Sequence, residues 1–457
     1  MPSVTQGFGR AIAGVICVAM SCGAQTSVHP APGPAPASAP AQKAAAYRLS
    51  KEADAFLEDL SKRSFMYFWE QADPKTGLVR DRSRTDGAAA SPGHRLIGSI
   101  ASTGFGLTGL CIAADHRWLP RDQLVARART TLTFFAEKAY QNHGWFYHWL
   151  NIETGEREWK SEVSSIDTAL LMGGVLTVRQ CFKDDAAIVR YAEAIYQRLD
   201  FTWMLNGHET LLSHGWHPET GFIKHRWAEF SEAMMLYILG LGSPVSAHAL
   251  PAASWAAWGR PQLTYGSYTY VTTVPPLFLH QYSHAWIDFR GWRDPVPPQP
   301  DWFANSVSAT RAQKQFCLDL AKAGEFPGYS ENIWGITASD TRNGYKAWGG
   351  PPRDRDIDGT VVPCAAAGSL MIAPDITVPA VMEMHRRFGD RIYGKYGFAD
   401  AFHPVDGWVN PDVIGIDVGI TLLSAENLRT GRVWRWFMAN EPIANGMRRA
   451  GMTRVSP

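Results

Sequence analysis

The sequence has 457 residues, of which 19% are charged, and a formal net charge of +1. That length accommodates two or three average domains or one large helical barrel. A near-neutral chain without a run of Lys and Arg does not suit the phosphate backbone of nucleic acids, so we expect no nucleic-acid partner. The 18 tryptophans and 12% aromatic residues are typical of carbohydrate-active proteins, which stack tryptophan on sugar rings, although any single tryptophan can equally be a core residue.

The first 49 residues have the pattern of export and tethering rather than of a fold. Residues 11–20 form an apolar run that is too short to span a bilayer and is typical of a signal peptide. The segment around Cys22 resembles a bacterial lipobox, so Cys22 is a candidate lipid anchor; ordinary cleavage nearby is the alternative. We predict a signal peptide over residues 1–22 and a Pro/Ala-rich tether over residues 23–49. The exported protein is expected in the periplasm, or at the outer membrane or cell surface as a lipoprotein.

Two kinds of helix alternate along the rest of the chain. One kind has a single apolar face, whereas the other is apolar on every side and must therefore be surrounded by protein. Alternating outer and inner helices describe a closed toroid, with five clear pairs and a sixth expected. We predict an all-α fold, an (α/α)6 barrel formed as a single domain by residues 50–457, with short strands in the connections, and a monomer. The amphipathic stretches are 50–69, 121–140, 185–205, 301–322 and 378–388, and the apolar ones are 101–114, 166–178, 232–241, 363–372 and 416–423.

The connections between the helices contain a recurring turn and two long irregular stretches. A Thr-Gly turn recurs at 73–78, 151–155 and 217–222, where Gly supplies the positive φ that a hairpin turn requires. The stretches 243–301 and 332–362 far exceed ordinary loop length and are rich in Pro, Gly and aromatic residues. We expect them to be ordered and to wall a cleft at the end of the barrel where the inner helices begin.

Neither the cysteines nor the charged loops predict a metal site. Cys111, Cys181, Cys317 and Cys364 lack zinc-ligand spacing, and we expect buried free thiols. The acidic loop 354–358 lacks the remainder of an EF-hand and is interpreted as a solvated loop or substrate rim. We expect no metal and no organic cofactor.

Acidic residues open several of the apolar helices. Glu162, Asp167, Glu229, Glu232 and Asp417 lie at or just before such a run, and each alone can be explained as a complement to the helix dipole. Together they place carboxyls at the edge of a low-dielectric wall, where burial raises a carboxyl pKa as a general acid requires. Two carboxyls of different pKa across a cleft are the equipment for glycoside hydrolysis. Further candidates for sugar binding lie beside these acids or after Pro275-Pro276, namely Trp216, His225, Arg226, Gln281, Tyr282, His284 and Asp288.

Six motifs follow one another between residues 102 and 335: 102–106 (STGFG), 144–148 (GWFYH), 161–169 (SEVSSIDTA), 229–232 (EFSE), 281–288 (QYSHAWID) and 327–335 (PGYSENIWG). Over about residues 60–446 the chain resembles the bacterial glycoamylase-like domain family, whose characterised members include endo-β-1,2-glucanases. The resemblance implies an (α/α)6 barrel that cleaves β-1,2-glucan internally with inversion of the anomeric centre. It implies Glu232 as the acid and Asp417 as the base acting through water, and it adds Tyr329, Glu331 and Trp334 to the candidate substrate-binding residues.

Three alternatives remain open from the sequence alone. The chain could act from chain ends or on another linkage, and the size of the product distinguishes these cases. A polysaccharide lyase on a similar toroid is disfavoured because the composition has no basic excess. A surface glycan-binding protein without catalysis is disfavoured because acids occupy the expected positions.

Overall fold

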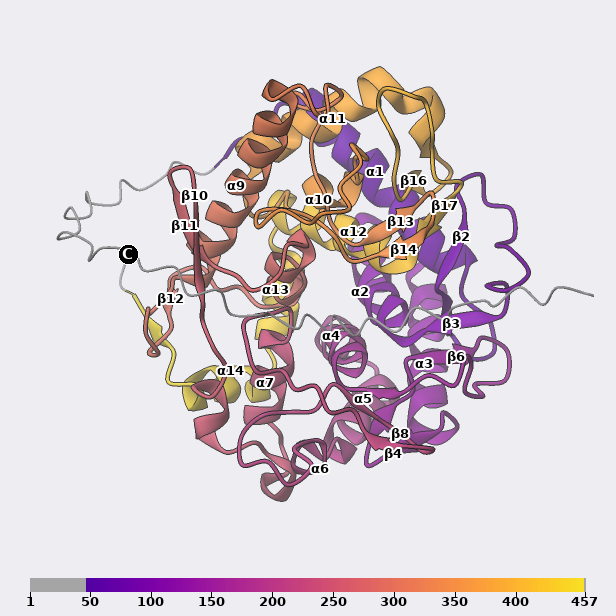
Figure 1. The fold of residues 1–457 in the computed structure, drawn as a ribbon. Coiled ribbons are helices and arrows are strands. Elements are labelled where there is room, and N and C mark those ends of the chain that lie inside the picture. Colours follow the sequence, from indigo (N-terminus) through magenta and orange to yellow (C-terminus); the bar gives the residue numbers. More distant parts are fainter. Residues whose placement is uncertain (1–46, 456–457) are drawn as a thin grey trace, which may run out of the picture.

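The structure is a computed structural model and describes residues 47–455. The predicted signal peptide, the candidate anchor at Cys22 and the tether as far as residue 46 lie outside the described residues. Within residues 47–455, no helix combines the length and the apolar character that a membrane span requires. The described chain forms one closed ring of helices with loops and hairpins over it (Figure 1).

Amphipathic helices form the outside of the ring, as the sequence predicts. Their buried residues repeat at helical spacing, as for Leu57, Leu60 and Phe65 in the first helix. Polar side chains cap several of them; for example, the Asp301 carboxylate accepts a hydrogen bond from the Ala304 N–H at 3.0 Å. The outer helices are α1 (Lys51–Glu70), α3 (Arg121–Glu137), α5 (Ala186–Arg198), α9 (Trp302–Lys322) and α11 (Pro374–Ile392), and the short α6 (Phe201–Met204) follows α5.

Apolar helices form the inner ring. They follow one another around the barrel axis, and the ring closes where the last of them packs against the first. The sixth inner helix, which the sequence left unlocated, is the five-residue α8 inside the stretch 243–301. The (α/α)6 barrel is therefore confirmed. The inner helices are α2 (Ile100–His116), α4 (Ser165–Cys181), α7 (Met234–Leu241), α8 (Tyr282–Trp286), α10 (Pro363–Ala367) and α12 (Gly415–Arg429).

Glycine permits the closest contact in the inner ring, between α2 and α4. A Cβ on Gly104 would lie 2.2 Å from the Leu170 carbonyl oxygen, and a Cβ on Gly174 would lie 2.1 Å from the Gly104 carbonyl oxygen. Both distances are far below van der Waals contact, so any larger residue would push the two helices apart. The close approach of α2 and α4 therefore depends on Gly104 and Gly174.

The C-terminal helices α13 (Arg432–Met438) and α14 (Glu441–Arg449) complete the barrel. Helix α13 packs against α4, α8 and α12, and α14 packs against α7. Trp434 is buried, and its indole N–H donates to the His284 carbonyl oxygen at 2.7 Å. Trp434 and Phe437 therefore belong to the core.

Short antiparallel strands lie in the connections, again as predicted. A three-stranded sheet pairs β7 with β8 and β8 with β9, so that Val163 lies opposite Trp216. Strand β2 pairs with β17, which joins the two ends of the chain, and β13 pairs with β14 in a hairpin over the ring (Figure 1). The strands used below are β1 (Val79–Arg80), β2 (Arg82–Arg84), β3 (Ile97–Ser99), β6 (Trp149–Asn151), β7 (Val163–Ser164), β8 (Gly215–His217), β9 (Gly221–Phe222), β13 (Ser339–Thr341), β14 (Gly344–Lys346), β16 (Gly397–Phe398) and β17 (Asp412–Ile414).

Candidate active site

Carboxyl groups converge where the inner helices begin. Glu232 lies two residues before α7, Asp167 lies in the first turn of α4, and Asp417 lies in the first turn of α12. At α4 the local cause is a serine cap, since the Ser164 hydroxyl accepts from the Asp167 N–H at 3.2 Å and donates to the Asp167 carboxylate at 2.5 Å. The cap fixes the direction in which the Asp167 side chain leaves the helix.

Glu232 combines partial exposure with a desolvated environment. Its side chain is half-buried, whereas every residue of α7 behind it is buried. Burial, reinforced by the nearby Asp167 carboxylate, raises the pKa of Glu232 to about 7. A carboxyl with this pKa is protonated for much of the time at neutral pH and can give its proton to a bound molecule.

His148 lies between two carboxylates on the same side of the site. Its Nδ1 is 3.0 Å from Glu162 Oε1, and its Nε2 is 3.4 Å from Asp167 Oδ1. Burial alone would lower the pKa of His148, but Asp167 and then Glu162 raise it to about 9. The imidazolium in turn keeps the pKa of Glu162 below its usual value despite burial, whereas burial raises the pKa of Asp167.

This trio also has the geometry of a metal site, because one ligand atom from each residue lies within 4.8 Å of the others. A protonated imidazole cannot donate a lone pair to a metal ion. Since the pKa of His148 is about 9, the imidazolium itself supplies positive charge between the carboxylates at neutral pH. The trio is therefore an ion-paired group at neutral pH, and a metal ion bound there would have to displace the His148 proton.

Asp417 is buried and is one of a pair of carboxyls. Its Oδ1 accepts a hydrogen bond from the Cys364 thiol at 3.2 Å. Burial raises the pKa of Asp417 to about 6, and a hydrogen bond from Asp400 opposes the rise. Burial and then the Asp417 charge raise the pKa of Asp400 well above its usual value, which favours a shared proton on Asp400 and the carboxylate form of Asp417. A cavity of about 20 Å³ lies beside both carboxyls and has room for one water molecule.

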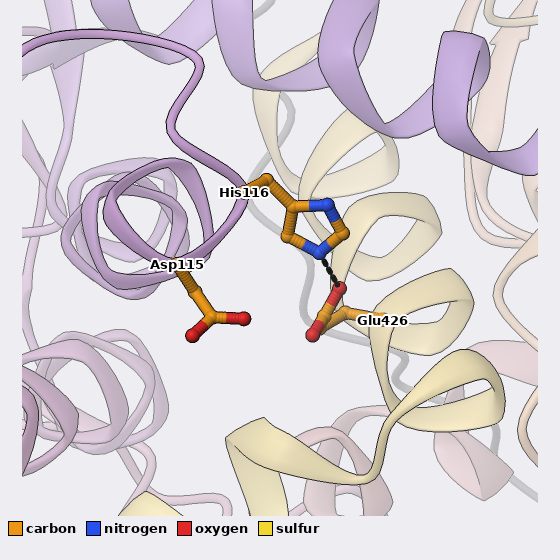
Figure 2. A group of neighbouring side chains, drawn as sticks. All are labelled: Asp115, His116 and Glu426. Atoms are coloured by element: carbon orange, nitrogen blue, oxygen red, sulfur yellow. Dashed lines mark hydrogen bonds and ion pairs between the residues drawn. The ribbon is translucent and has the colours of Figure 1, made fainter.

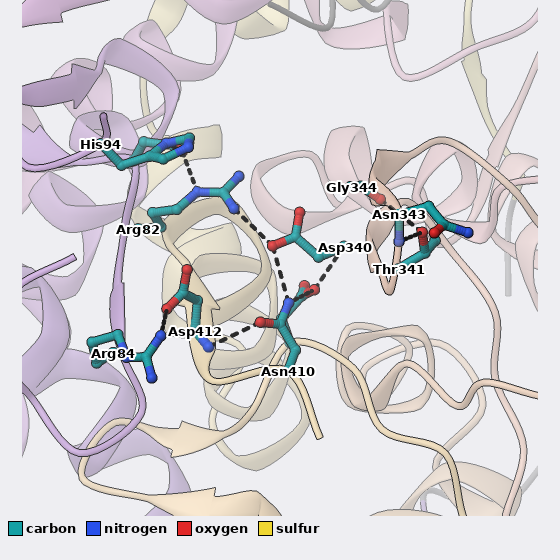
Figure 3. A network of polar contacts seen from close by, with 11 residues as sticks. Arg82, Arg84, His94, Asp340, Thr341, Asn343, Gly344, Asn410 and Asp412 are labelled. Carbon is teal, nitrogen blue, oxygen red and sulfur yellow. Dashed lines mark hydrogen bonds and ion pairs between the residues drawn. The ribbon is translucent and has the colours of Figure 1, made fainter. Parts of the chain in front are cut away.

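A polar network behind Asp400 holds the β13–β14 hairpin against the barrel (Figure 3). The Asn410 amide donates to both Asp340 and Asp400 at 3.0 Å, and the Asp340 N–H donates to Asp400 at 2.8 Å. Arg82, on β2, binds Asp340 at 2.7 Å and Asp81 at 3.0 Å. The network thus connects the base of the hairpin to β2 and to the residues just before β17.

Two tyrosines complete the site. Tyr345 is carried by strand β14 of the anchored hairpin, and burial together with Asp417, Asp400 and Asp81 raises its pKa strongly. Tyr282 opens α8, and burial, Asp417 and Glu232 all raise its pKa. Both phenols therefore stay protonated and can donate hydrogen bonds within the site.

The structure brings five of the predicted site residues together: Glu162, Asp167, Glu232, Tyr282 and Asp417. Three other predicted site residues precede Glu232 in the chain: Trp216 lies on β8, and His225 and Glu229 lie between β9 and Glu232. Trp216 is half-buried, while His225 and Glu229 are exposed. For these three the structure offers a position near the site but no partner that defines a role.

Four predicted sugar-binding residues have side chains that are buried or donors that are occupied within the protein, and their predicted role stays a prediction. Arg226 donates to the Leu205 and Leu211 carbonyl oxygens at 2.8 and 2.7 Å. Gln281 is fully buried and bridges α8 to α10 through the Ala365 carbonyl oxygen at 2.9 Å. Tyr329 is buried with its hydroxyl on the Thr360 carbonyl oxygen, and Trp334 is fully buried in the core.

Three further predicted residues have their contacts elsewhere in the protein, and their predicted role in sugar binding stays a prediction. His284 is fully buried and lies 2.9 Å from the Ser306 hydroxyl. Asp288 follows the far end of α8 and pairs with Arg290 at 2.8 Å. Glu331 is 72% exposed and pairs with Lys314 on the outer helix α9.

Sequence reasoning missed several residues of the site. His148 is the last residue of the motif 144–148, which directly precedes the acidic motif 161–169. This order of motifs could have marked His148 as a site residue. The other missed residues lie in or beside short strands, and strand pairing brings them to the site: Asp81, Asp340, Tyr345 and Asp400. No local sequence pattern marks them.

A second cluster is formed by Asp115, His116 and Glu426 (Figure 2). It lies at the C-terminal ends of α2 and α12, whereas the candidate active site lies at the helix starts. His116 Nε2 is 2.9 Å from Glu426, and its Nδ1 is 3.0 Å from Glu58. The cluster already contains its own cations, because Arg432 pairs with Asp115 and Arg429 pairs with Glu58 at 2.6 Å. It is an ion-pair network that joins the C-terminal ends of the inner helices to α1 and α13.

The fold and the carboxyls at the helix starts define the class of the protein, an (α/α)6 barrel with an acidic candidate site where its inner helices begin. Residues 224–441 match the glycoamylase family model described as "Putative glucoamylase". The chain thus carries a glycoamylase-like domain, and the resemblance seen in the motifs is confirmed.

Known proteins of similar fold have related activities. The solved endo-β-1,2-glucanase of Chitinophaga pinensis, in complex with sophorotriose and glucose, is 26% identical with a TM-score of 0.80, covering 89% of this chain and 99% of that one. A putative glucoamylase of Bacteroides fragilis is 28% identical with a TM-score of 0.80, covering 91% and 100%. An exo β-1,2-glucooligosaccharide sophorohydrolase (non-reducing end) of Parabacteroides distasonis is 26% identical over 441 residues, which is 89% of this chain but 59% of that protein. The chain thus spans less than two thirds of the length of this curated relative.

Proposed function

We propose that the protein hydrolyses β-1,2-linked glucan, cutting within the chain and inverting the anomeric centre. The observation that carries the proposal is Glu232, a half-buried carboxyl with a pKa of about 7 at the start of a wholly buried helix. The names of the Chitinophaga and Parabacteroides relatives support the β-1,2 linkage.

Glu232 acts as the general acid in this proposal. Its carboxyl gives a proton to the oxygen of the scissile glycosidic bond, which leaves as the hydroxyl of one product. Asp417, the ionised member of the Asp400–Asp417 pair, takes a proton from the water that adds to the anomeric carbon. The proton lost by Glu232 and the proton gained by Asp417 balance, and bulk water resets both groups.

The remaining groups bind sugar hydroxyls and stabilise charge. Glu162 is held ionised beside the His148 imidazolium, and both are partly accessible, with side chains 16% exposed. Tyr282 and Tyr345 supply neutral hydroxyl donors. The positive charge that develops on the sugar ring in the transition state faces a site rich in carboxylates, which stabilise it.

Action within the chain is the finer part of the proposal. The Chitinophaga relative is named an endo-enzyme and the Parabacteroides relative an exo-enzyme. The former matches over nearly its whole length, whereas this chain covers 59% of the latter. We therefore favour the endo mode, with removal of sophorose from chain ends as the competing outcome.

Incubation with linear β-1,2-glucan and a panel of other α- and β-glucans tests the proposal. We expect hydrolysis of the β-1,2 polymer alone, with short oligosaccharides of mixed length from the earliest time points. A proton NMR time course should show the α-anomer first. Release of a single disaccharide would replace the endo mode by an exo mode, and turnover of another glucan alone would overturn the linkage.

We also propose that the protein is exported. The apolar run at residues 11–20 and the lipobox-like segment at Cys22 support this proposal. Expression of the full chain with and without Cys22→Ser, followed by fractionation, should move the protein from the membrane fraction to the periplasm if Cys22 is lipidated. Recovery of both forms in the cytoplasm would reject export.

A further inference from the structure

Trp159 stands apart from the other tryptophans because its indole is exposed. It is 37% exposed, whereas the other tryptophans are buried or half-buried in residues 47–455, the range that contains all 18 of them. An exposed indole forgoes the burial that stabilises most tryptophans. Its position in the connection between β6 and β7 therefore requires another explanation.

The backbone at Trp159 is held in an unfavourable conformation. Trp159 and Lys160 both have φ = +50°, a region that residues with a side chain beyond hydrogen rarely adopt. Arg157 holds the turn in place, since its guanidinium donates to the Lys160 and Ser161 carbonyl oxygens, both at 2.6 Å. The Glu158 N–H also donates to the Trp149 carbonyl oxygen at 3.0 Å. Such strain persists only where surrounding contacts enforce it, and it concentrates at binding sites.

A row of aromatic rings connects Trp159 to the candidate active site. Trp159 packs edge-on against Trp149, with ring centroids 5.5 Å apart, and Trp149 stacks on His148 at 3.9 Å. His148 is the residue held between Glu162 and Asp167. On its other side, Trp159 packs edge-on against His94, whose Nδ1 is 3.8 Å from Asp81. The indole is thus supported from two sides and is continuous with the acidic site.

We propose that Trp159 is a sugar-binding platform, at which a glucosyl ring of the bound glucan stacks on the indole at a subsite removed from the scissile bond. This proposal rests on the proposed function and extends it. The axial hydrogens on one face of a glucopyranose form an apolar surface that matches an indole face, while its hydroxyls stay in water. A partly exposed, rigidly held indole beside a carboxylate-rich site meets both requirements.

The platform predicts a dependence on substrate length. A chain long enough to reach from Glu232 to Trp159 gains a stacking contact that shorter chains lack. Affinity and kcat/KM should therefore rise at one particular chain length, and the rise should depend on Trp159.

Binding measured without turnover tests the platform. Calorimetric titration of Glu232→Gln protein with β-1,2-glucooligosaccharides of increasing length is compared with the same titration of Glu232→Gln/Trp159→Ala protein. We expect the long oligosaccharides to bind roughly tenfold more weakly to the double variant, and the shortest to bind equally well. Trp159→Phe should retain part of the effect. Tyr47→Ala is the matched control, because Tyr47 is 40% exposed just before the start of α1 and should leave binding unchanged.

The outcomes separate the platform from the proposed function. Equal binding of long chains with and without Trp159 overturns the platform and leaves the hydrolase proposal intact. A uniform loss at every chain length also overturns it, since that result indicates a structural role for Trp159. Absence of binding and turnover with β-1,2-glucans rejects the proposed function. In that case the same titrations with the remaining glucans of the panel test whether Trp159 binds sugar. The platform proposal is overturned unless Trp159→Ala weakens the binding of one of these glucans.

Discussion

The Cys364 thiol donates a hydrogen bond to Oδ1 of Asp417 at 3.2 Å, and both groups are buried. The bond stabilises the ionised form of Asp417, the proposed base, in a place where burial opposes ionisation. Cys364 thus connects α10 to the reacting end of α12 and gives a direct way to vary the base without removing it.

Substitution of Cys364 should move the acidic limb of the pH–activity profile. Activity requires ionised Asp417 and protonated Glu232, so kcat/KM is expected to be bell-shaped with limbs near pH 6 and pH 7. Cys364→Ala removes a donor and should shift the acidic limb to higher pH by roughly half a unit. Cys364→Ser supplies a stronger donor and should shift this limb to lower pH. The buried Cys317 provides the control, as Cys317→Ala should leave both limbs in place. An unchanged acidic limb in both Cys364 variants would exclude Asp417 as the titrating base.

Glu232→Gln should abolish turnover and stabilise the protein at alkaline pH. The folded state holds the Glu232 proton up to about pH 7, but the unfolded chain releases it near the usual glutamate pKa of 4.5. The free energy of unfolding of the unsubstituted protein therefore falls as the pH rises through this window, and an uncharged glutamine avoids the loss. Above pH 7 the Glu232→Gln protein should be more stable by about 2 kcal/mol. Thermal melts at pH 4 and pH 8 measure the effect, which should be absent at pH 4. The surface variant Glu383→Gln serves as a control, and a destabilised Glu232→Gln at pH 8 contradicts the assigned environment.

His148 should stabilise the fold most strongly at mildly acidic and neutral pH. Because its folded pKa of about 9 exceeds the usual 6.5, its contribution is complete below pH 6.5 and is lost as the pH rises through 9. His148→Gln should cost about 2–3 kcal/mol near pH 6.5 and much less above pH 9. Urea unfolding at these two pH values checks the prediction. A cost that is the same at both would show that packing, rather than charge, explains the role of His148.

Asp400 should tolerate asparagine better than alanine. Asp400 is neutral in the folded protein, so Asn keeps a donor for Asp417 and an acceptor for Asn410 and the Asp340 N–H. Alanine leaves these buried donors unpaired, at a cost of about 1–3 kcal/mol. Urea unfolding and kcat/KM should both rank Asp400→Asn above Asp400→Ala, and the reverse order would show that Asp400 is ionised.

Asp340 should anchor the hairpin that carries Tyr345. Its carboxylate pairs with Arg82 where both side chains are shielded, 14% and 12% exposed. Asp340→Ala should destabilise the fold by about 3 kcal/mol, because Arg82 and Asn410 lose their partner, and should also raise KM. Arg342, on the same hairpin, pairs with the exposed Asp406 and provides a matched control. Arg342→Ala should change neither the melting temperature nor KM measurably. Equal effects of the two variants would contradict a specific anchoring role.

Much of the fold was predictable because it depends on local periodicity. A helix buried on one face and a helix buried on all faces differ in sequence, so the alternation of 121–140 with 166–178 already describes a toroid. The five-residue α8 escaped detection because it is too short to show a period. The folded chain holds it as a helix through its packing against α12 and α13.

The spacing of apolar residues already places Glu162, Asp167, Glu232 and Asp417 at the starts of buried helices, since helix position follows from spacing along the chain. Only the tertiary structure decided which groups they meet. Asp400 reaches Asp417 from the connection between β16 and β17, and His148 reaches Asp167 from the connection between α3 and α4. Those contacts depend on strand pairing and on helix packing, which join residues far apart in the chain. They also set the pKa values, because the charge and burial around a carboxyl are properties of the folded site and not of its sequence neighbours.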